Sequence, residues 1–86
     1  MNVDYSYVVD AAALGFFGQC SSREREQLLR VFESLAQAPS QRGEWLRRTT
    51  SGRDLQIKRF GKWLVTFWPD HAVRELRIVD VERIIP

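Results

Sequence analysis

Hydrophobic and polar residues alternate in three consecutive short runs in the C-terminal half of the chain. Asp54 to Phe60 and Trp63 to Trp68 are rich in β-branched and aromatic residues, and Gly61-Lys62 between them is a hairpin turn signal. Pro69 to Ala72 supplies a second turn, because proline presets φ and aspartate bonds to its own backbone. Val73 to Val81 then returns antiparallel. The pattern predicts a three-stranded meander on which the rest of the chain packs.

The middle run carries apolar residues on both faces. Trp63, Val65 and Phe67 point one way, and Leu64 and Trp68 point the other way. We therefore expect a central strand that is covered on both sides, with Trp63 in the core. The strand before it divides into Leu55, Ile57 and Arg59 on one face and Gln56, Lys58 and Phe60 on the other. One face of that strand is expected to be basic and wet.

The N-terminal residues predict a strand and a short helix. Asp4 to Val9 alternates polar with aromatic or aliphatic residues, as a half-buried strand does. Asp10 is a suitable N-cap for a helix over Ala11 to Gly18. In that helix, Leu14 and Phe17 are spaced to face the core.

A longer helix follows, with a clear start and a clear end. Ser21 and Glu24 have the spacing of a capping box, in which two side chains satisfy two free backbone N–H groups. Pro39 disfavours helical geometry at Ala38 and should end the helix there. The apolar stripe between these signals consists of Leu28, Val31, Phe32 and Leu35.

Pro39 to Thr50 has no firm pattern, and we expect a loop that Trp45 and Leu46 anchor, with room for a short extended piece. The order β-α-α-β-β-β predicts an α+β fold in which two N-terminal helices pack on an antiparallel sheet. With 86 residues the chain can bury one core, so residues 1–86 are expected to form a single domain.

Composition excludes several classes of protein. No apolar run approaches the roughly 20 residues of a membrane span, and the first residues lack the basic and apolar regions of a secretory signal, so we expect a cytoplasmic protein without a membrane partner. Cys20 and His71 are the single cysteine and histidine, so we expect no disulfide, no metal site and no cofactor. A buried Cys20 and a surface His71 are the simplest interpretation.

Positive charge is unevenly distributed although the net charge is only +2. Residues 1–43 contain four Lys/Arg and five Asp/Glu, whereas residues 44–86 contain nine and six. One segment has six cations against Asp54 alone, namely Arg47, Arg48, Arg53, Lys58, Arg59 and Lys62. It fits a phosphate-binding surface, or equally a solvated sheet edge that resists aggregation. The last strand can bring Arg77 and Arg83 near it, and such a group without histidines suits phosphodiester binding.

Several short motifs occur in a familiar order. They are L-x-x-x-P in Leu35 to Pro39, I-K-R-x-G in Ile57 to Gly61, W-L-V-T-F in Trp63 to Phe67, and R-I-V-D-V-x-R in Arg77 to Arg83. Together with the order of elements, they resemble the RelE/ParE toxin superfamily of bacterial type II toxin–antitoxin systems. The resemblance implies a toxin whose partner is a cognate antitoxin protein.

The superfamily contains two activities. RelE-like members are mRNA interferases that cut the message on the ribosome through the ribose 2′-OH, without metal, whereas ParE-like members poison DNA gyrase. Lys58 matches one RNA-activating lysine of the nucleases, Gln56 stands where a second is expected, and Arg59 compensates for it. Arg83 resembles the basic residue after the last strand. The resemblance thus implies Lys58, Arg59 and Arg83 as the catalytic set.

The remaining cations have an RNA-binding role in this interpretation. They are Arg47, Arg48, Arg53, Lys62 and Arg77. Glu44 and Glu82 are the candidate general bases. Trp63 stands where many members have an arginine, and no tyrosine or histidine like that near the C-terminus of several nucleases occurs up to Pro86. A gyrase inhibitor without nuclease activity and a non-toxic adaptor that retains the fold therefore stay open as alternatives.

Overall fold

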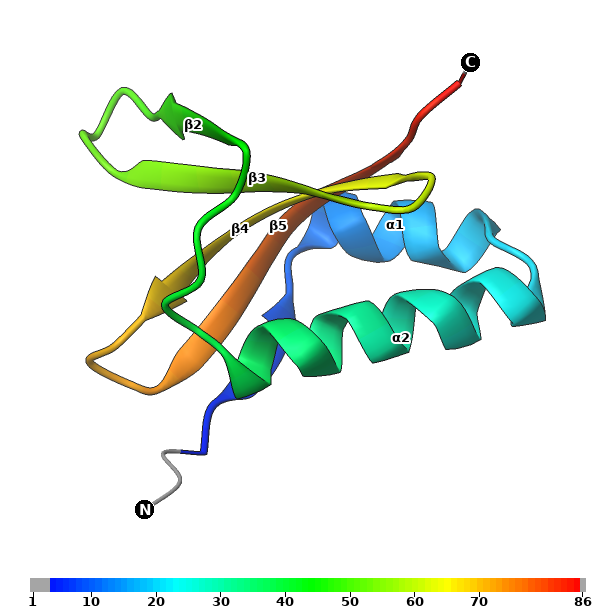
Figure 1. The fold of residues 1–86 in the computed structure, drawn as a ribbon, viewed down its shortest axis with the longest axis horizontal. Coiled ribbons are helices and arrows are strands. Elements are labelled where there is room, and N and C mark those ends of the chain that lie inside the picture. The colour runs from blue at the N-terminus through cyan, green and yellow to red at the C-terminus, as the bar shows by residue number, and fades with distance from the viewer. Residues whose placement is uncertain (1–3, 86) are drawn as a thin grey trace.

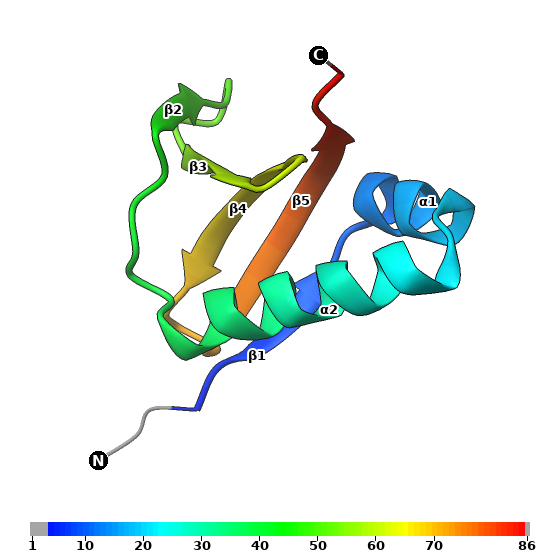
Figure 2. The same cartoon turned by 45° about the vertical axis from the view of Figure 1, so that its right-hand side comes forward.

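A computed structural model describes residues 4–85 as a five-stranded sheet with two helices on one side (Figures 1 and 2). The strand order is β1-β5-β4-β3-β2, antiparallel except for the pairing of β1 with β5. The elements are β1 (Ser6–Val9), α1 (Ala11–Gln19), α2 (Ser22–Gln37), β2 (Trp45–Arg48), β3 (Asp54–Phe60), β4 (Trp63–Asp70) and β5 (Glu75–Arg83). The α+β class and the helices on the sheet are as predicted. Within residues 4–85, neither helix has the length and apolar character needed to cross a membrane.

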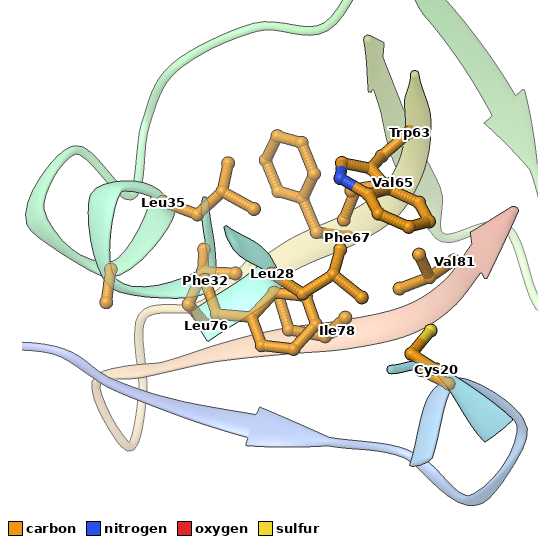
Figure 3. Close-up of a cluster of buried hydrophobic side chains, with 12 residues drawn as sticks. Cys20, Leu28, Phe32, Leu35, Trp63, Val65, Phe67, Leu76, Ile78 and Val81 are labelled. Atoms are coloured by element: carbon orange, nitrogen blue, oxygen red, sulfur yellow. The ribbon is translucent and has the colours of Figure 1, made fainter. Parts of the chain in front are cut away.

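The core lies between α2 and the central strands β4 and β5 (Figure 3). Trp63, Val65 and Phe67 face the helices, as the alternation in the sequence predicts. Leu64 and Trp68, on the other face of β4, are half-buried. The remaining large core side chains are Leu28, Phe32 and Leu35 from α2, and Leu76, Ile78 and Val81 from β5.

The capping box at the start of α2 is confirmed. The Ser21 backbone N–H donates to Glu24 Oε1 at 3.0 Å, and the Glu24 backbone N–H donates to Ser21 Oγ at 3.2 Å. The helix ends at Gln37, before Ala38 and Pro39. Both boundaries are set locally, because the cap and the proline act on their own neighbouring backbone groups.

The predicted inward face of α1 is wrong in part. Phe17 packs against the core, but Leu14 is 56% exposed. The stripe that faces inward is Ala13, Phe16, Phe17 and Cys20. Asp10 occupies the N-cap position with extended backbone, yet its side chain makes no capping bond. Its carboxylate lies instead 3.9 Å from Arg77 Nε.

The segment predicted as a loop contains β2, which adds a strand to the predicted meander. The Gly43 N–H donates to Gln56 Oε1 at 2.8 Å, and a Cβ at Gly43 would collide with the Ile57 carbonyl, so only glycine permits this approach to β3. Trp45 and Leu46 are 53% and 63% exposed and do not anchor a loop in the core. β2 is thus an exposed edge strand, which forms because its backbone pairs with β3.

The second turn lies later than predicted, because β4 continues through Pro69 to Asp70. The turn occupies residues 71–74, where Arg74 has a φ of 54°. A β-bulge then shifts the pairing, since Thr66 faces Asp80 whereas Phe67 faces Ile78. The extra residue, Val79, reverses the alternation along β5.

The reversal has a direct consequence for the end of β5. Ile78 and Val81 are both buried against the helices, although an uninterrupted strand would point them to opposite faces. Arg83 consequently lies on the helix side, opposite Trp63. Without the bulge it would point away from the helices.

Substitution of two adjacent leucines of α2 tests which residues form the core. Leu28 is fully buried and Leu29 is 41% exposed. Leu28→Ala should lower the free energy of unfolding by about 2–5 kcal/mol, because it leaves a cavity in the core. Leu29→Ala removes the same atoms from a partly exposed site and should change stability by only about 0.5 kcal/mol. Urea denaturation of both variants measures the difference, and equal losses would contradict this core.

Candidate nucleic-acid interface

Lys58 lies on the helix side of the sheet, at a place that the helices leave open. The helices contact chiefly β1 and β5, and β3 extends beyond them (Figure 2). Lys58 shares this side with Phe60, and its Nζ atom is 5.6 Å from the centroid of the Phe60 ring. Next to it, between α2 and the β3–β4 turn, runs an open groove lined by Gln27, Val31, Phe60, Gly61, Lys62 and Trp63.

Lys62 and Arg83 meet on the same side around one carboxylate. Glu24 Oε2 accepts from Lys62 Nζ at 3.1 Å and from Arg83 Nη2 at 2.9 Å. Arg83 Cζ lies 5.3 Å from the Trp63 ring centroid and 5.5 Å from that of Phe16. The two aromatic rings themselves pack edge to face at 5.9 Å. Cations over aromatic faces keep their charge while the rings shield their aliphatic stems.

Glu24 is the functional candidate that sequence reasoning missed as a site residue. The backbone N–H of Ser21, the ammonium of Lys62 and the guanidinium of Arg83 together lower the pKa of Glu24 to about 2, against an opposing effect of burial. The carboxylate is therefore ionised at neutral pH. Its capping-box spacing located it on α2, but only folding brings it to two cations that lie 38 and 59 residues away in the chain.

The helix-side cations can act on one phosphodiester. Lys58 of β3 pairs with Val65 of β4, which in turn pairs with Val81 of β5. Arg83 lies two residues beyond Val81 on β5 and on the same side of the sheet. With strands about 4.8 Å apart and about 3.4 Å per residue, the Cα atoms of Lys58 and Arg83 are roughly 12 Å apart. Extended lysine and arginine side chains span that distance from both ends. Two such cations stabilise the extra negative charge of a five-coordinate phosphate.

Arg59 does not join them, because neighbouring residues of a strand point to opposite faces. It pairs with Leu64, and its Nε atom donates to the Gly61 carbonyl at 2.9 Å. Arg53 lies on the same outer face, with its guanidinium 3.8 Å from the ring centroid of Trp68. Arg47 and Trp45 continue this outer face on β2. The structure thus divides the predicted basic segment between two faces.

Arg48 and Arg77 have acidic partners. Arg48 Nε lies 2.9 Å from Asp54 Oδ1, and this carboxylate raises the pKa of the guanidinium. Arg77 lies on β5, where its guanidinium is 3.5 Å from Glu75 and 3.9 Å from Asp10. Arg77 pairs with Val8 of β1 on one side and with Trp68 of β4 on the other, and the Trp68 ring carries the Arg53 guanidinium, so Arg77 approaches the basic segment through Trp68. Both arginines are partly neutralised.

Neither predicted general base lies between Lys58 and Arg83, although Glu44 reaches the peptide that joins Lys58 to Arg59. Glu44 Oε2 accepts the backbone N–H of Arg59 at 3.1 Å. Glu82 pairs with Leu64 and points to the outer face. The carboxylate that the structure places at the cation cluster is Glu24, whose low pKa makes it a weak base.

Cys20 and Gln56 both have structural roles. Cys20 is buried, and burial raises the pKa of its thiol, so it is a small core residue rather than a nucleophile. Gln56, where the resemblance expects a second lysine, lies on the helix side with Lys58 but binds the Gly43 N–H. It fixes the chain before β2 instead of adding a charge.

The depressed pKa of Glu24 predicts a pH dependence of stability. A carboxyl whose pKa falls from 4.5 to about 2 on folding stabilises the native state above pH 4.5, and this contribution is lost as the pH falls toward 2. Wild type should therefore exceed Glu24→Gln in urea midpoint at neutral pH, by a margin that narrows at about pH 3. Glu26→Gln, at an exposed position of the same helix, is the control and should show no such narrowing.

Comparison with known proteins agrees with the fold. No protein-family model matches the chain, and neither does any curated protein sequence. A crystal structure of the toxin–antitoxin complex RelBE2 from Mycobacterium tuberculosis contains a chain that superposes with a TM-score of 0.78 at 18% identity. The match covers 94% of this chain and 99% of the other. The chain therefore has the RelE-like α+β fold that the resemblance of its motifs implies.

Proposed function

We propose that this protein is the toxin of a type II toxin–antitoxin system and acts as a ribosome-dependent, metal-independent mRNA endoribonuclease. The observation that supports it is the placement of Lys58, Lys62 and Arg83 on one side of the sheet, with Lys58 beside the Phe60 ring, Lys62 beside Trp63, and Arg83 beside Trp63 and Phe16. The fold shared with a chain of a toxin–antitoxin complex supports the same proposal.

The reaction requires charge stabilisation rather than a bound cofactor. The ribose 2′-oxygen forms a bond to phosphorus while the bond to the 5′-oxygen of the next nucleotide breaks, leaving a cyclic phosphate and a 5′-hydroxyl. Lys58 binds the scissile phosphate, and Arg83 stabilises its developing charge. The 2′-hydroxyl gives up a proton and the departing 5′-oxygen takes one up, so the step needs both a base and an acid. Glu44 holds the backbone N–H of Arg59 and Glu82 points to the outer face, so water or groups of the ribosome accept the first proton and supply the second.

The outer face has a separate role in this proposal. On the side opposite Lys58 lie Arg47 of β2, Arg59 of β3 and Arg53, which directly precedes β3. They bind phosphates of ribosomal RNA or of the message outside the reacting site. Phosphate contacts of this kind fix the orientation of a bound protein without reading sequence.

Primer extension tests the catalytic assignment. Expression of the wild-type chain should arrest growth and produce mRNA cuts that disappear when translation is blocked. Lys58→Ala with Arg83→Ala should abolish both effects, because the two cations assigned to the scissile phosphate are then missing. Arg30→Ala, an exposed cation on α2, is the matched control and should remain toxic. Unchanged cleavage by the double variant would refute the assignment.

Binding measurements test the division between the two faces. Arg47→Ala with Arg53→Ala should weaken ribosome binding, and the plot of log affinity against log salt should become shallower by roughly 0.7–0.9 for each lost phosphate contact. Cleavage at saturating protein should be retained. Lys58→Ala should leave ribosome affinity nearly normal and remove most of the mRNA cleavage. If both variants lose affinity and cleavage together, the two faces do not have separate roles.

A second candidate function is a gyrase inhibitor without nuclease activity. The observation that favours it is that each nearby carboxylate is engaged otherwise: Glu44 accepts the backbone N–H of Arg59, Glu82 points to the outer face, and Glu24 is held at low pKa. Induced cells would then filament with damaged DNA, and gyrase supercoiling would fall in vitro while mRNA stayed intact. A retained fold without any growth effect would indicate the non-toxic adaptor.

The proposal includes a cognate antitoxin as partner. A small open reading frame next to this gene would encode it. Its co-expression should restore growth and co-purify with this chain, whereas an unrelated antitoxin should not.

A further inference from the structure

Glu24 connects three segments of the chain at the proposed site. One carboxylate oxygen accepts the backbone N–H of Ser21 at the start of α2. The other accepts from Lys62 in the β3–β4 turn and from Arg83 at the end of β5. The Glu24 side chain is only 19% exposed, whereas those of Lys62 and Arg83 are 49% and 42% exposed. The anion is therefore the inner member of the group, and the cations face solvent.

The geometry leaves both cations able to bind a second anion. Arg83 has five N–H donors in a rigid fork, and its bond to Glu24 comes from Nη2. Lys62 has three donors, and its Nζ lies 4.9 Å from the Trp63 ring centroid. Glu24 and the aromatic rings thus hold each cation in one place without using up its hydrogen-bonding capacity.

The same carboxylate also lowers the attraction of the site for RNA. One negative charge beside two positive charges leaves a local charge of +1, so a bound phosphate meets a weaker field than the cations alone would give. Holding the cations in place stabilises chiefly the transition state, in which negative charge develops on the phosphate. The weaker field lowers the affinity for the bound RNA in the ground state and the transition state alike. The two effects oppose each other and can be separated by experiment.

We propose that Glu24 is a positioning residue that holds Arg83 and Lys62 ready for the transition state while reducing the affinity of the site for ground-state RNA. This inference rests on the proposed function for its catalytic part only. Its structural part, the ordering of Arg83 by Glu24, stands independently of any activity. The pairing of a helix-cap carboxylate with two site cations is the observation that carries it.

Glu24→Gln is the informative substitution, because glutamine can still accept the Ser21 N–H while its charge and its second acceptor are lost. On ribosomes programmed with mRNA, kcat should fall about tenfold or more, as expected for a misplaced catalytic group. KM, and the Kd for a short RNA with a 2′-deoxy block at the cleavage position, should fall roughly two- to fivefold. The salt dependence of that Kd should become steeper by up to about 0.7.

Two matched controls separate positioning from charge and from helix capping. Glu26→Gln makes the same charge change at an exposed position two residues away and should affect kcat and Kd little. Ser21→Ala removes the hydroxyl that accepts the Glu24 N–H but leaves the carboxylate with its cations, so it should lower stability and preserve kcat. A fall in kcat for Ser21→Ala equal to that for Glu24→Gln would overturn the inference.

Arginine side-chain NMR gives a readout that needs neither RNA nor activity. The Nη–H signals of Arg83 should be resolved in wild type and in Glu26→Gln, and averaged by rotation in Glu24→Gln. If they are the same in all three proteins, the inference fails even if the enzyme proposal is correct. If wild type cuts no RNA, the enzyme proposal fails, and the NMR and affinity differences alone then decide whether Glu24 orders an anion-binding site.

Discussion

The limited cover that two short helices can give constrains this protein more than any other feature. α1 and α2 have 9 and 16 residues, and they pack chiefly on β1 and β5 with side chains that reach β4. A five-stranded sheet is wider than this pair can bury, because each strand adds about 4.8 Å. The helix side of β3 is therefore open, and Lys58 occupies a position that would be core in a domain with more helix.

The boundary between the covered and the open part of the sheet is where the chemistry gathers. Trp63 is 3% exposed and belongs to the core, yet its ring also lies close to Lys62 and Arg83. The N-terminus of α2 contributes Glu24 at the same place. The packing that stabilises the fold thus also orders the charged groups, which explains how one sheet with two short helices can hold several cations in fixed positions.

Local patterns predicted what local interactions control. The capping box and the inward stripe of α2, and the alternation along β4, were confirmed, because each depends on neighbouring residues and on the period of a helix or strand. The inward position that the spacing predicts for Leu14 is wrong, since α1 is apolar on nearly all sides and period alone cannot select its face. The sequence predicts a loop where β2 lies, because all four residues of β2 are exposed and the strand exists through its pairing with β3.

Hydrophobic periodicity and capping signals are sufficient to specify the α+β class, most of the core and the opposite directions of Lys58 and Arg59. Which cations share a face depends on how the elements pair and pack. The bulge at Val79 places Arg83 on the helix side, and the packing of α2 brings Glu24 to it from 59 residues away. Register and packing are long-range properties, in which one inserted residue reverses every side chain beyond it, so no pattern within a single run could supply them.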